Sequence, residues 1–320
     1  MRRAGYAVAA GACAAGAARL AYSAMSRRPP GGPKAWSRTN HRGEPVTLLE
    51  GPAVAAGALA GVLAQAGLAS RAQAGLVPAS GSPGASGWRR AAAMALGGAG
   101  AAAFGAYDDL AGSGDRRGFR GHLGALRQGE VTTGAVKLGG IGVTGVVSAA
   151  LAGGSPADVI LNAGLVAGGA NLLNLFDLRP GRAFKVAAAS GVLLGAAGQD
   201  SVAAPLGAAL ALLPEDLGER AMLGDAGANA LGAMLGASAA GLSRPARIVL
   251  LAGIAGLTAA SEKVSFTKVI ARTPALNWLD MLGRRPAPQT EPSGTEPSGT
   301  APPLPQPPVT IPAQRPESGG

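Results

Sequence analysis

The stretch NLLNLFDLRPGR, from Asn171 to Arg182, ends a long apolar segment with a polar cluster. Asn171 and Asn174 lie three residues apart, which places them on one face of a helix. Asp177 follows after three more residues, and a basic turn containing Pro180 comes next. An ionisable group at the end of a membrane-length helix is costly unless it is paired or functional. Asp177 is therefore either the partner of a nearby arginine or a member of a site.

The composition favours a helical membrane protein. Of the 320 residues, 48% are hydrophobic and 14% are charged, whereas soluble domains carry roughly 25% charged residues. Aromatic residues make up 3% of the chain, and 52 residues are glycine. Small residues suit membrane helices because they let the backbones approach closely. We therefore expect an all-α fold, a polytopic membrane bundle of about nine or ten transmembrane helices.

Charge, cysteine and histidine content exclude several function classes. The net charge of +10 is typical of nucleic-acid binding, but the basic residues lie in short loops between apolar runs, so we expect no nucleic-acid partner. Cys13 is the single cysteine, which excludes an intramolecular disulfide and a cysteine-based metal site. The two histidines, His41 and His122, are too few for a His-rich metal cage, and we expect both in exposed loops.

Nine apolar segments approach the length that a bilayer requires. They lie near residues 4–25, 46–68, 88–107, 133–153, 156–176, 183–198, 200–213, 222–242 and 245–261. The first resembles a signal peptide but has no convincing cleavage site, so we interpret it as a spanning helix. The chain therefore divides into a membrane domain, residues 1–285, and a tail, residues 286–320. The tail is rich in Pro, Ser and Thr, which predicts disorder.

The basic residues predict the orientation in the membrane. If every segment spans, the loops after segments 1, 3, 5, 7 and 9 share one face with the tail. Only seven of the 28 Lys and Arg residues fall on the opposite face: Arg2, Arg3, Arg71, Arg89, Arg90, Arg244 and Arg247. Because positive charge favours the cytoplasmic side, we expect a multi-pass plasma-membrane protein with its N-terminus outside and its tail in the cytoplasm.

Three acidic motifs converge on that cytoplasmic face. Asp108 and Asp109 end the third segment in FGAYDDL, Asp177 ends the fifth, and Asp225 begins the eighth in LGDAGANALG. The convergence requires that segments 6 and 7 are two separate helices. Carboxylates suit Mg²⁺, which is usually held by one or two of them together with the phosphates of a substrate. A magnesium ion beside a diphosphate at a membrane boundary indicates phosphoryl transfer between a soluble nucleotide compound and a lipid phosphate.

Each of these residues also has a structural alternative. The Asp108–Asp109 pair can be solvated charge at a helix end. Asp225 can be the N-cap of the helix that follows it. Asn171 and Asn174 can be hydrogen-bond partners between helices, and Lys137 can extend to the membrane interface.

With these motifs the sequence resembles the polyprenyl-phosphate N-acetylhexosamine-1-phosphate transferases (glycosyl transferase family 4). That family includes the phospho-N-acetylmuramoyl-pentapeptide transferase of peptidoglycan synthesis and N-acetylglucosamine-1-phosphate transferases. The resemblance covers roughly residues 30 to 285. The matching pieces, in the family's order, are RTNHRGEPVTLLEGP for the first cytoplasmic loop, AYDDL for the aspartate pair, NLLNLFD for N-x-x-N-x-x-D, LGDAGANALG for G-D-x-G-S-x-x-L-G and ARTPALNWLDMLGR for the last cytoplasmic loop.

The resemblance implies Mg²⁺-dependent transfer of a sugar 1-phosphate from a UDP-N-acetylhexosamine to undecaprenyl phosphate, with release of UMP, in cell-envelope polymer synthesis. It also implies that a homodimer is possible. Asp177 and Asp109 match metal-handling residues, and Asp108 matches the candidate base. The expected catalytic residues are thus Asp108, Asp109 and Asp177, the expected metal ligands Asp177 and Asp109, and the expected substrate-binding residues Asn171, Asn174, Asp225, Lys137 and Arg182.

The chain departs from the family pattern at three places. Where the family continues D-G-L-D-G, this sequence reads DLRPGR, so that Pro180 replaces the second aspartate. Ala228 replaces the serine of the G-D-x-G-S motif, and residues Ala275–Trp278 carry none of the family's histidines. Arg179 or Arg182 is then a candidate for the phosphate contacts. The rival hypotheses are a catalytically degenerate relative that binds the lipid carrier or scaffolds other membrane proteins, and a transporter.

Overall fold

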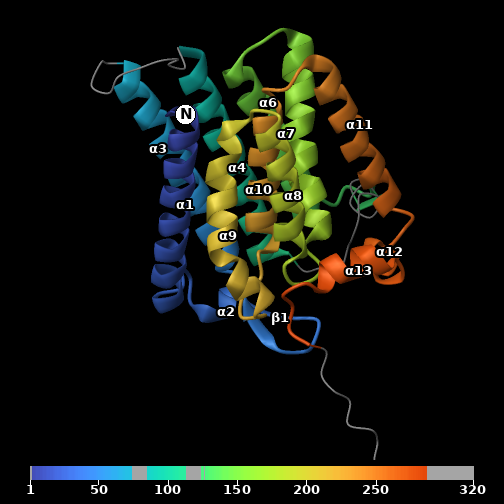
Figure 1. Cartoon of the computed structure of the whole chain (residues 1–320). Helices are drawn as coiled ribbons and strands as arrows, with labels where there is room; N and C mark the ends of the chain where they lie inside the picture. Colours follow the sequence, from blue (N-terminus) through green and yellow to red (C-terminus); the bar gives the residue numbers. More distant parts are fainter. Residues whose placement is uncertain (1, 74–84, 113–123, 126, 287–320) are drawn as a thin grey trace, which may run out of the picture. The chain divides into compact units, whose positions relative to one another are not determined.

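The computed structural model describes residues 2–73, 85–112, 124–125 and 127–286. Its regular structure is nearly all helical (Figure 1). The long helices of this part of the chain are α1 (Arg2–Arg27), α3 (Glu50–Gln73), α4 (Ala85–Ala111), α6 (Thr133–Ala152), α7 (Pro156–Phe176), α8 (Arg182–Ala196), α9 (Ala203–Leu217), α10 (Gly224–Ala239) and α11 (Arg244–Ser261). Each predicted apolar segment overlaps one of these helices, and segments 6 and 7 form two separate helices, as expected.

The shorter elements were not anticipated from the sequence. They are α2 (Pro33–Trp36), β1 (Ser37–Thr39), β2 (Pro45–Thr47), the 3₁₀ turn η1 (Asp200–Val202), α12 (Phe266–Arg272) and α13 (Pro274–Met281). The predicted tail from residue 286 lies outside the described residues apart from Pro286, and so does His122.

Fewer helices than expected qualify as membrane spans by length and composition. Among the described residues, three helical stretches do so: Glu50–Ser70, Thr133–Ala152 and Pro156–Phe176. A fourth is added if α11 and α12, which meet at a bend of 95°, count as one span. Helices α8 and α9 have 15 residues each, which gives a length of about 22 Å against a hydrocarbon core of about 30 Å. The structure thus supports a helical fold with three or four candidate spans among the described residues, fewer than the nine or ten expected.

Small residues bring the long helices together. A Cβ atom on Gly61 of α3 would lie 2.7 Å from the carbonyl oxygen of Ala10 on α1. One on Gly169 of α7 would lie 2.6 Å from the carbonyl oxygen of Gly232 on α10. Both distances are too short for a side chain, so glycine is required where these helix backbones meet.

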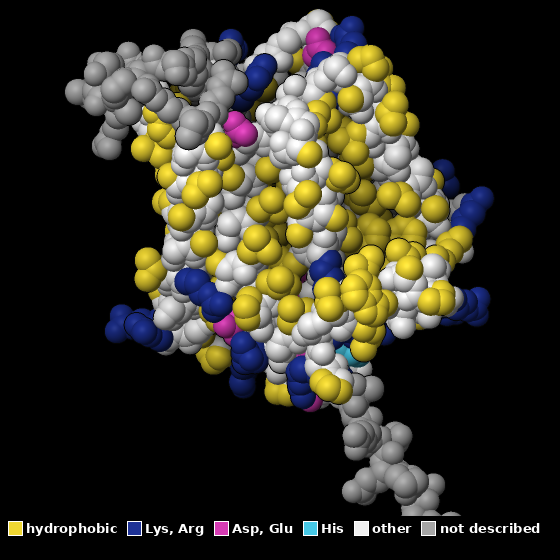
Figure 2. All heavy atoms as spheres, viewed as in Figure 1, with side chains coloured by type: hydrophobic (Ala, Val, Ile, Leu, Met, Phe, Trp, Pro, Cys, Tyr) yellow, Lys and Arg dark blue, Asp and Glu magenta, His cyan; other side chains and the backbone are white. Residues whose placement is uncertain are grey.

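Helix α10 is the most buried element and contacts α3, α4, α7 and α8. The largest side chains buried around it include Phe184, Leu165 and Met234. Apolar side chains also point outward, among them Ile160 at 75% and Leu193 at 72% exposure. Figure 2 shows hydrophobic side chains over the middle of the face in view, with Lys and Arg mainly toward its upper and lower borders. Such a band suits a bilayer better than water.

Successive long helices run in opposite directions, so α4, α7 and α9 end where α6, α8 and α10 begin (Figure 1). This end is also covered by the antiparallel hairpin β1–β2, in which Arg38 is paired with Val46. Thr47 of the hairpin forms an isolated bridge with Ala221, just before α10. The hairpin therefore fixes the loop Asn40–Glu44 beside the helix ends that carry the acidic motifs.

Candidate functional site

The first part of the site is an ion-paired triad from three helices. The Nζ atom of Lys137, in the first turns of α6, lies 2.6 Å from Asp108 Oδ2 and 2.6 Å from Asp225 Oδ2. Asp108 comes from the end of α4 and Asp225 from the start of α10. The three side chains are 13%, 15% and 24% exposed. Because it donates to both carboxylates at short range, Lys137 is a partner within the site and not a group that extends to the membrane interface.

Asp109 joins the triad by capping α10 from another helix. Its Oδ1 atom accepts the backbone N–H of Asp225 at 3.1 Å, and its Oδ2 atom accepts that of Ala226 at 2.9 Å. The residue at the N-cap position of α10 is Leu223, and it makes no side-chain cap. The alternative that Asp225 is the N-cap of its own helix is therefore wrong, because Asp109 satisfies the first N–H groups of that helix.

Asp177 lies next to this group at the C-cap position of α7. Its carboxylate accepts the backbone N–H of Gly224. Gly224 has a φ of +62°, and a Cβ atom on it would lie 3.1 Å from Asp109 Oδ2. The glycine thus stands between the two aspartates, in a conformation and a space that suit no larger residue. Burial and the nearby charges of Asp216, Asp225 and Asp109 raise the pKa of Asp177 well above its usual value.

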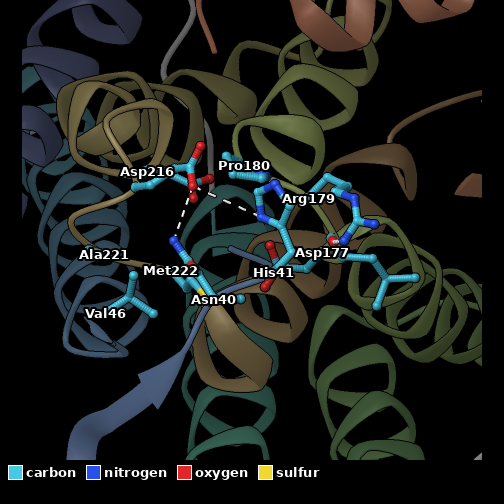
Figure 3. A pocket seen from close by; sticks show the side chains of 11 residues that line it. Asn40, His41, Val46, Asp177, Arg179, Pro180, Asp216, Ala221 and Met222 are labelled. Atoms are coloured by element: carbon cyan, nitrogen blue, oxygen red, sulfur yellow. Dashed lines mark hydrogen bonds and ion pairs between the residues drawn. The ribbon is translucent and has the colours of Figure 1, made fainter. Parts of the chain in front are cut away.

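A cavity of about 30 Å³ adjoins Asp177 (Figure 3). This volume exceeds the 10–15 Å³ or so that a single water or small ion needs. Its lining residues are Asn40, His41, Val46, Asp177, Leu178, Arg179, Pro180, Asp216, Glu219, Ala221 and Met222. The cavity therefore lies between the hairpin loop, the end of α7 and the end of α9.

Asp216 is the residue of this cavity that the sequence reasoning missed. It lies at the end of α9, is 2% exposed, and accepts the backbone N–H of Gly181 at 3.0 Å through Oδ2. Burial, together with the charge of the neighbouring Glu219, raises the pKa of Asp216 to about 7. The surrounding PEDLGER lies between the predicted segments 200–213 and 222–242 and belongs to no motif. Its only sequence signal was an acidic pair next to a proline.

Glu219 holds the hairpin loop against the cavity. It is buried and is the one described non-glycine residue with a positive φ, at 55°. Its carboxylate accepts Arg42 Nε at 3.0 Å and Asn40 Nδ2 at 3.0 Å. His41 Nδ1 lies 4.0 Å from the same carboxylate. His41 is exposed in the turn of the hairpin, as expected, and it also lines the cavity.

Arg182, expected to bind substrate, is buried in another cluster. It is 4% exposed, and its Nε and Nη2 atoms donate to Asp280 of α13 at 2.7 and 3.0 Å. Its Nη1 atom donates to Thr267 at 3.0 Å. The guanidinium therefore ties α8 to α12 and α13 and is not directed at the cavity.

The two asparagines contribute less to the site than expected. Asn171 Nδ2 donates to Thr258 of α11 at 3.3 Å, which is the interhelical alternative. Asn174 is half-buried, and its carbonyl oxygen accepts the N–H of Asp177 at 3.1 Å where α7 ends. The structure thus brings together Asp108, Asp109, Lys137, Asp177 and Asp225, and places Arg182 and Asn171 elsewhere.

A second unanticipated carboxylate lies close by. Glu50, the first residue of α3, is fully buried, and neither of its carboxylate oxygens has a hydrogen-bond partner among the described residues. Its strongest charged neighbours are Asp216 and Asp177. Together with those two aspartates it forms a group of closely spaced buried carboxyls, and a bound cation would stabilise their charged forms.

The carboxylates beside the cavity are too few to enclose a metal ion by themselves, but they suit magnesium. In the part of the chain that the structure describes, no three His, Cys, Asp or Glu side chains are arranged to hold a metal ion. Mg²⁺ needs only one or two protein carboxylates, because waters and substrate phosphates complete its coordination. Asp177 and Asp216 line the same cavity and meet that requirement. Asp109 is less available, since both of its oxygens already accept backbone N–H groups.

Comparisons with known proteins do not assign the chain to a family: no family model matches it, and no curated protein does.

Proposed function

We propose that the chain is a membrane-embedded transferase. It transfers an N-acetylhexosamine 1-phosphate, or phospho-MurNAc-pentapeptide, from a UDP-sugar to a polyprenyl phosphate such as undecaprenyl phosphate, and it releases UMP. The observation that carries the proposal is the gathering of carboxylates from α4, α7, α9 and α10 at one end of the helices. Asp109 and Ala226, for example, are in contact although they lie 117 residues apart. The motif resemblance supplies four of the acidic side chains in this group.

In this proposal all nine long helices cross the plasma membrane, and the carboxylates lie at its cytoplasmic boundary with the tail on the same side. The outward apolar side chains support the proposal, since Val8, Val192 and Val249 are 66–72% exposed. The opposite directions of successive helices support it too.

The reaction requires no enzyme nucleophile. An oxygen of the lipid phosphate attacks the sugar-bearing phosphorus of the UDP-sugar, a new P–O–P bond forms, and the bond to the uridine-bearing phosphate breaks, so that UMP leaves. Asp108, held beside Lys137, accepts the proton of the lipid phosphate. Lys137 offsets the charge of Asp108 and Asp225, and Asp109 keeps α10 in place. A magnesium ion held by Asp177 and Asp216 would neutralise the diphosphate oxygens.

A release assay tests this function. The purified full chain in lipid nanodiscs is given undecaprenyl phosphate and a panel of UDP-sugars, and UMP is measured with and without Mg²⁺. We expect Mg²⁺-dependent release with at least one sugar. Asp177→Asn and Asp109→Asn should each lower the rate by about 100-fold or more, while Glu44→Gln, at an exposed ion pair with Arg285, should leave it unchanged. Full activity in both aspartate variants would contradict the assigned site.

A second function is favoured by one specific observation. Lys137 already neutralises Asp108 and Asp225 at 2.6 Å, and Pro180 stands where the family carries another aspartate. A chain with this arrangement suits binding of a lipid phosphate without turnover. Saturable binding of undecaprenyl phosphate, without UMP release from any sugar in the panel, would select this function over the transferase.

A further inference from the structure

The basic turn after Asp177 contains two arginines, and only one of them is available to a ligand. Arg182 is buried, and it donates to Asp280 and Thr267 through three nitrogens. Arg179, three residues earlier, lines the cavity together with Asp177 and Asp216 (Figure 3). The structure thus separates two residues that the sequence leaves equivalent.

The guanidinium of Arg179 makes few polar contacts in the described part of the folded chain. Its hydrogen bond is to the carbonyl oxygen of the adjacent Leu178, at 3.2 Å. Among the described residues no carboxylate lies within ion-pair distance of it, whereas Arg42 and Arg182 are paired with Glu219 and Asp280. Four of the five N–H donors of an arginine fork are therefore left for another partner.

The turn fixes where Arg179 stands. Pro180 is buried and restricts the backbone. Gly181 has a φ of +72° and donates its N–H to Asp216, and a Cβ atom there would clash with the side chain of Leu217. The backbone of Arg179 is thus held in a constant relation to Asp216, which lowers the entropy lost when a ligand binds.

The side chains that line the cavity favour ligands of both charges. The carboxylates of Asp177 and Asp216 favour a cation, while the guanidinium of Arg179 favours an anion with several acceptor oxygens. A phosphate group that carries a divalent cation satisfies both. The volume of about 30 Å³ suits an ion and phosphate oxygens and excludes a base or a sugar, which would lie outside the cavity.

We propose that Arg179 binds a phosphate of the nucleotide substrate in this cavity, where Asp177 and Asp216 would hold the accompanying cation. The inference rests on the proposed function, since it assigns the side chain that holds the diphosphate of that substrate. It also explains how a turn without the family's second aspartate can serve the site: the carboxylate comes from Asp216, and the turn itself contributes a cation.

A binding experiment tests the inference apart from turnover. The detergent-solubilised full chain is titrated with UDP in the presence of MgCl₂, and the Kd is measured by calorimetry. Loss of a charge-assisted hydrogen bond should raise the Kd of Arg179→Gln about ten- to 100-fold. Arg179→Lys keeps the positive charge but lacks the planar guanidinium with its several N–H donors. Its Kd for UDP should therefore lie between those of Arg179→Gln and the unsubstituted chain. Arg220→Gln, at an exposed ion pair with Glu215, is the matched control and should bind as the unsubstituted chain does.

A parallel titration with a short-chain polyprenyl phosphate distinguishes the source of the phosphate. We expect this second Kd to be unchanged in Arg179→Gln. Weaker lipid-phosphate binding with unchanged UDP binding would overturn the assignment to the nucleotide. Equal UDP binding by a folded Arg179→Gln and the unsubstituted chain would overturn the inference altogether, even if the chain releases UMP. Arg179-dependent UDP binding without any UMP release would uphold the inference while the transferase proposal fails.

Discussion

Asp109, at the end of α4, accepts the backbone N–H of Asp225, at the start of α10, across 3.1 Å. The two residues are separated by 116 positions in the chain. This contact replaces the usual local cap of α10 with one from another helix, so α10 cannot shift along α4 without losing it. Because Asp225 also pairs with Lys137, the position of the Asp225 carboxylate depends on α4, α6 and α10.

We expect Lys137→Met to destabilise the protein. It leaves Asp108 and Asp225 as neighbouring like charges in a mostly buried space, and breaking such a pair costs about 3 kcal/mol. The midpoint of thermal unfolding in detergent should fall by several degrees. The double variant Lys137→Met with Asp108→Asn removes one of the two charges and should recover part of the loss. An unchanged midpoint in the single variant would mean that the ammonium group adds nothing to folding.

Asp280→Ala should release α13 from the helix ends. The substitution leaves Arg182 and Arg284 buried without their shared carboxylate, at a cost of about 3–5 kcal/mol for an uncompensated buried charge. Trypsin should then cut faster at Lys263 and Lys268, which flank the start of α12. Asp280→Asn keeps two polar atoms and should be cut at an intermediate rate. Equal cutting of all three chains would show that this ion pair does not hold the segment.

Magnesium binding should strengthen as the pH rises from 6 to 8. Asp216 has a pKa of about 7 in the folded chain, so below that pH it keeps a proton that a bound cation must displace. The stability of the metal-free protein should change in the opposite direction. It should fall as the pH rises from about 4 to 7, because in this range the unfolded chain, with an ordinary aspartate pKa, binds fewer protons than the folded one.

The measurement is the rise in unfolding temperature that MgCl₂ causes at pH 6, 7 and 8, with EDTA as the metal-free reference. In Asp216→Asn the pH dependence should flatten, since the amide does not titrate. A magnesium effect of equal size at all three pH values would argue against a carboxylate that titrates near 7.

Gly169→Ala should weaken the packing of α7 against α10. Its new methyl group would lie 2.6 Å from the carbonyl oxygen of Gly232, which is backbone and cannot rotate away. We expect a cost of about 1–3 kcal/mol from this overpacking, seen as a lower unfolding midpoint and weaker UDP binding. Gly256→Ala on α11 is the matched control, because nothing lies within 4 Å of its Cβ position. Equal midpoints for the two variants would contradict the role of the close contact.

The helices could be read from the sequence because apolar length is a strong and local signal. Nine segments predicted nine long helices, and the break near Gln199 and Asp200 was placed correctly. The number of membrane spans was harder to predict, since α8 and α9 are short and polar residues interrupt others. The strands β1 and β2 were missed because each has three residues, too few for a pattern of alternation to register.

The site was predictable where a motif carried it. Asp108, Asp109, Asp177 and Asp225 were all identified from short signatures, and the structure brings them together. Asp216 lies in no signature, and Glu50, although it lies within RTNHRGEPVTLLEGP, was not singled out there. Only the folded arrangement places both residues beside Asp177. The difference between Arg179 and Arg182 was likewise invisible, because it depends on Asp280, which lies 98 residues away from Arg182.

The ring of Phe176 stacks on that of Phe266, with centroids 5.2 Å apart and planes inclined by 17°. Phe176 directly precedes Asp177, and Phe266 begins α12 just past the 95° bend. The pair therefore links α12 to the residue that directly precedes Asp177. A change in the tilt of α12 would therefore displace the ring of Phe176 and, through the backbone, the adjacent Asp177.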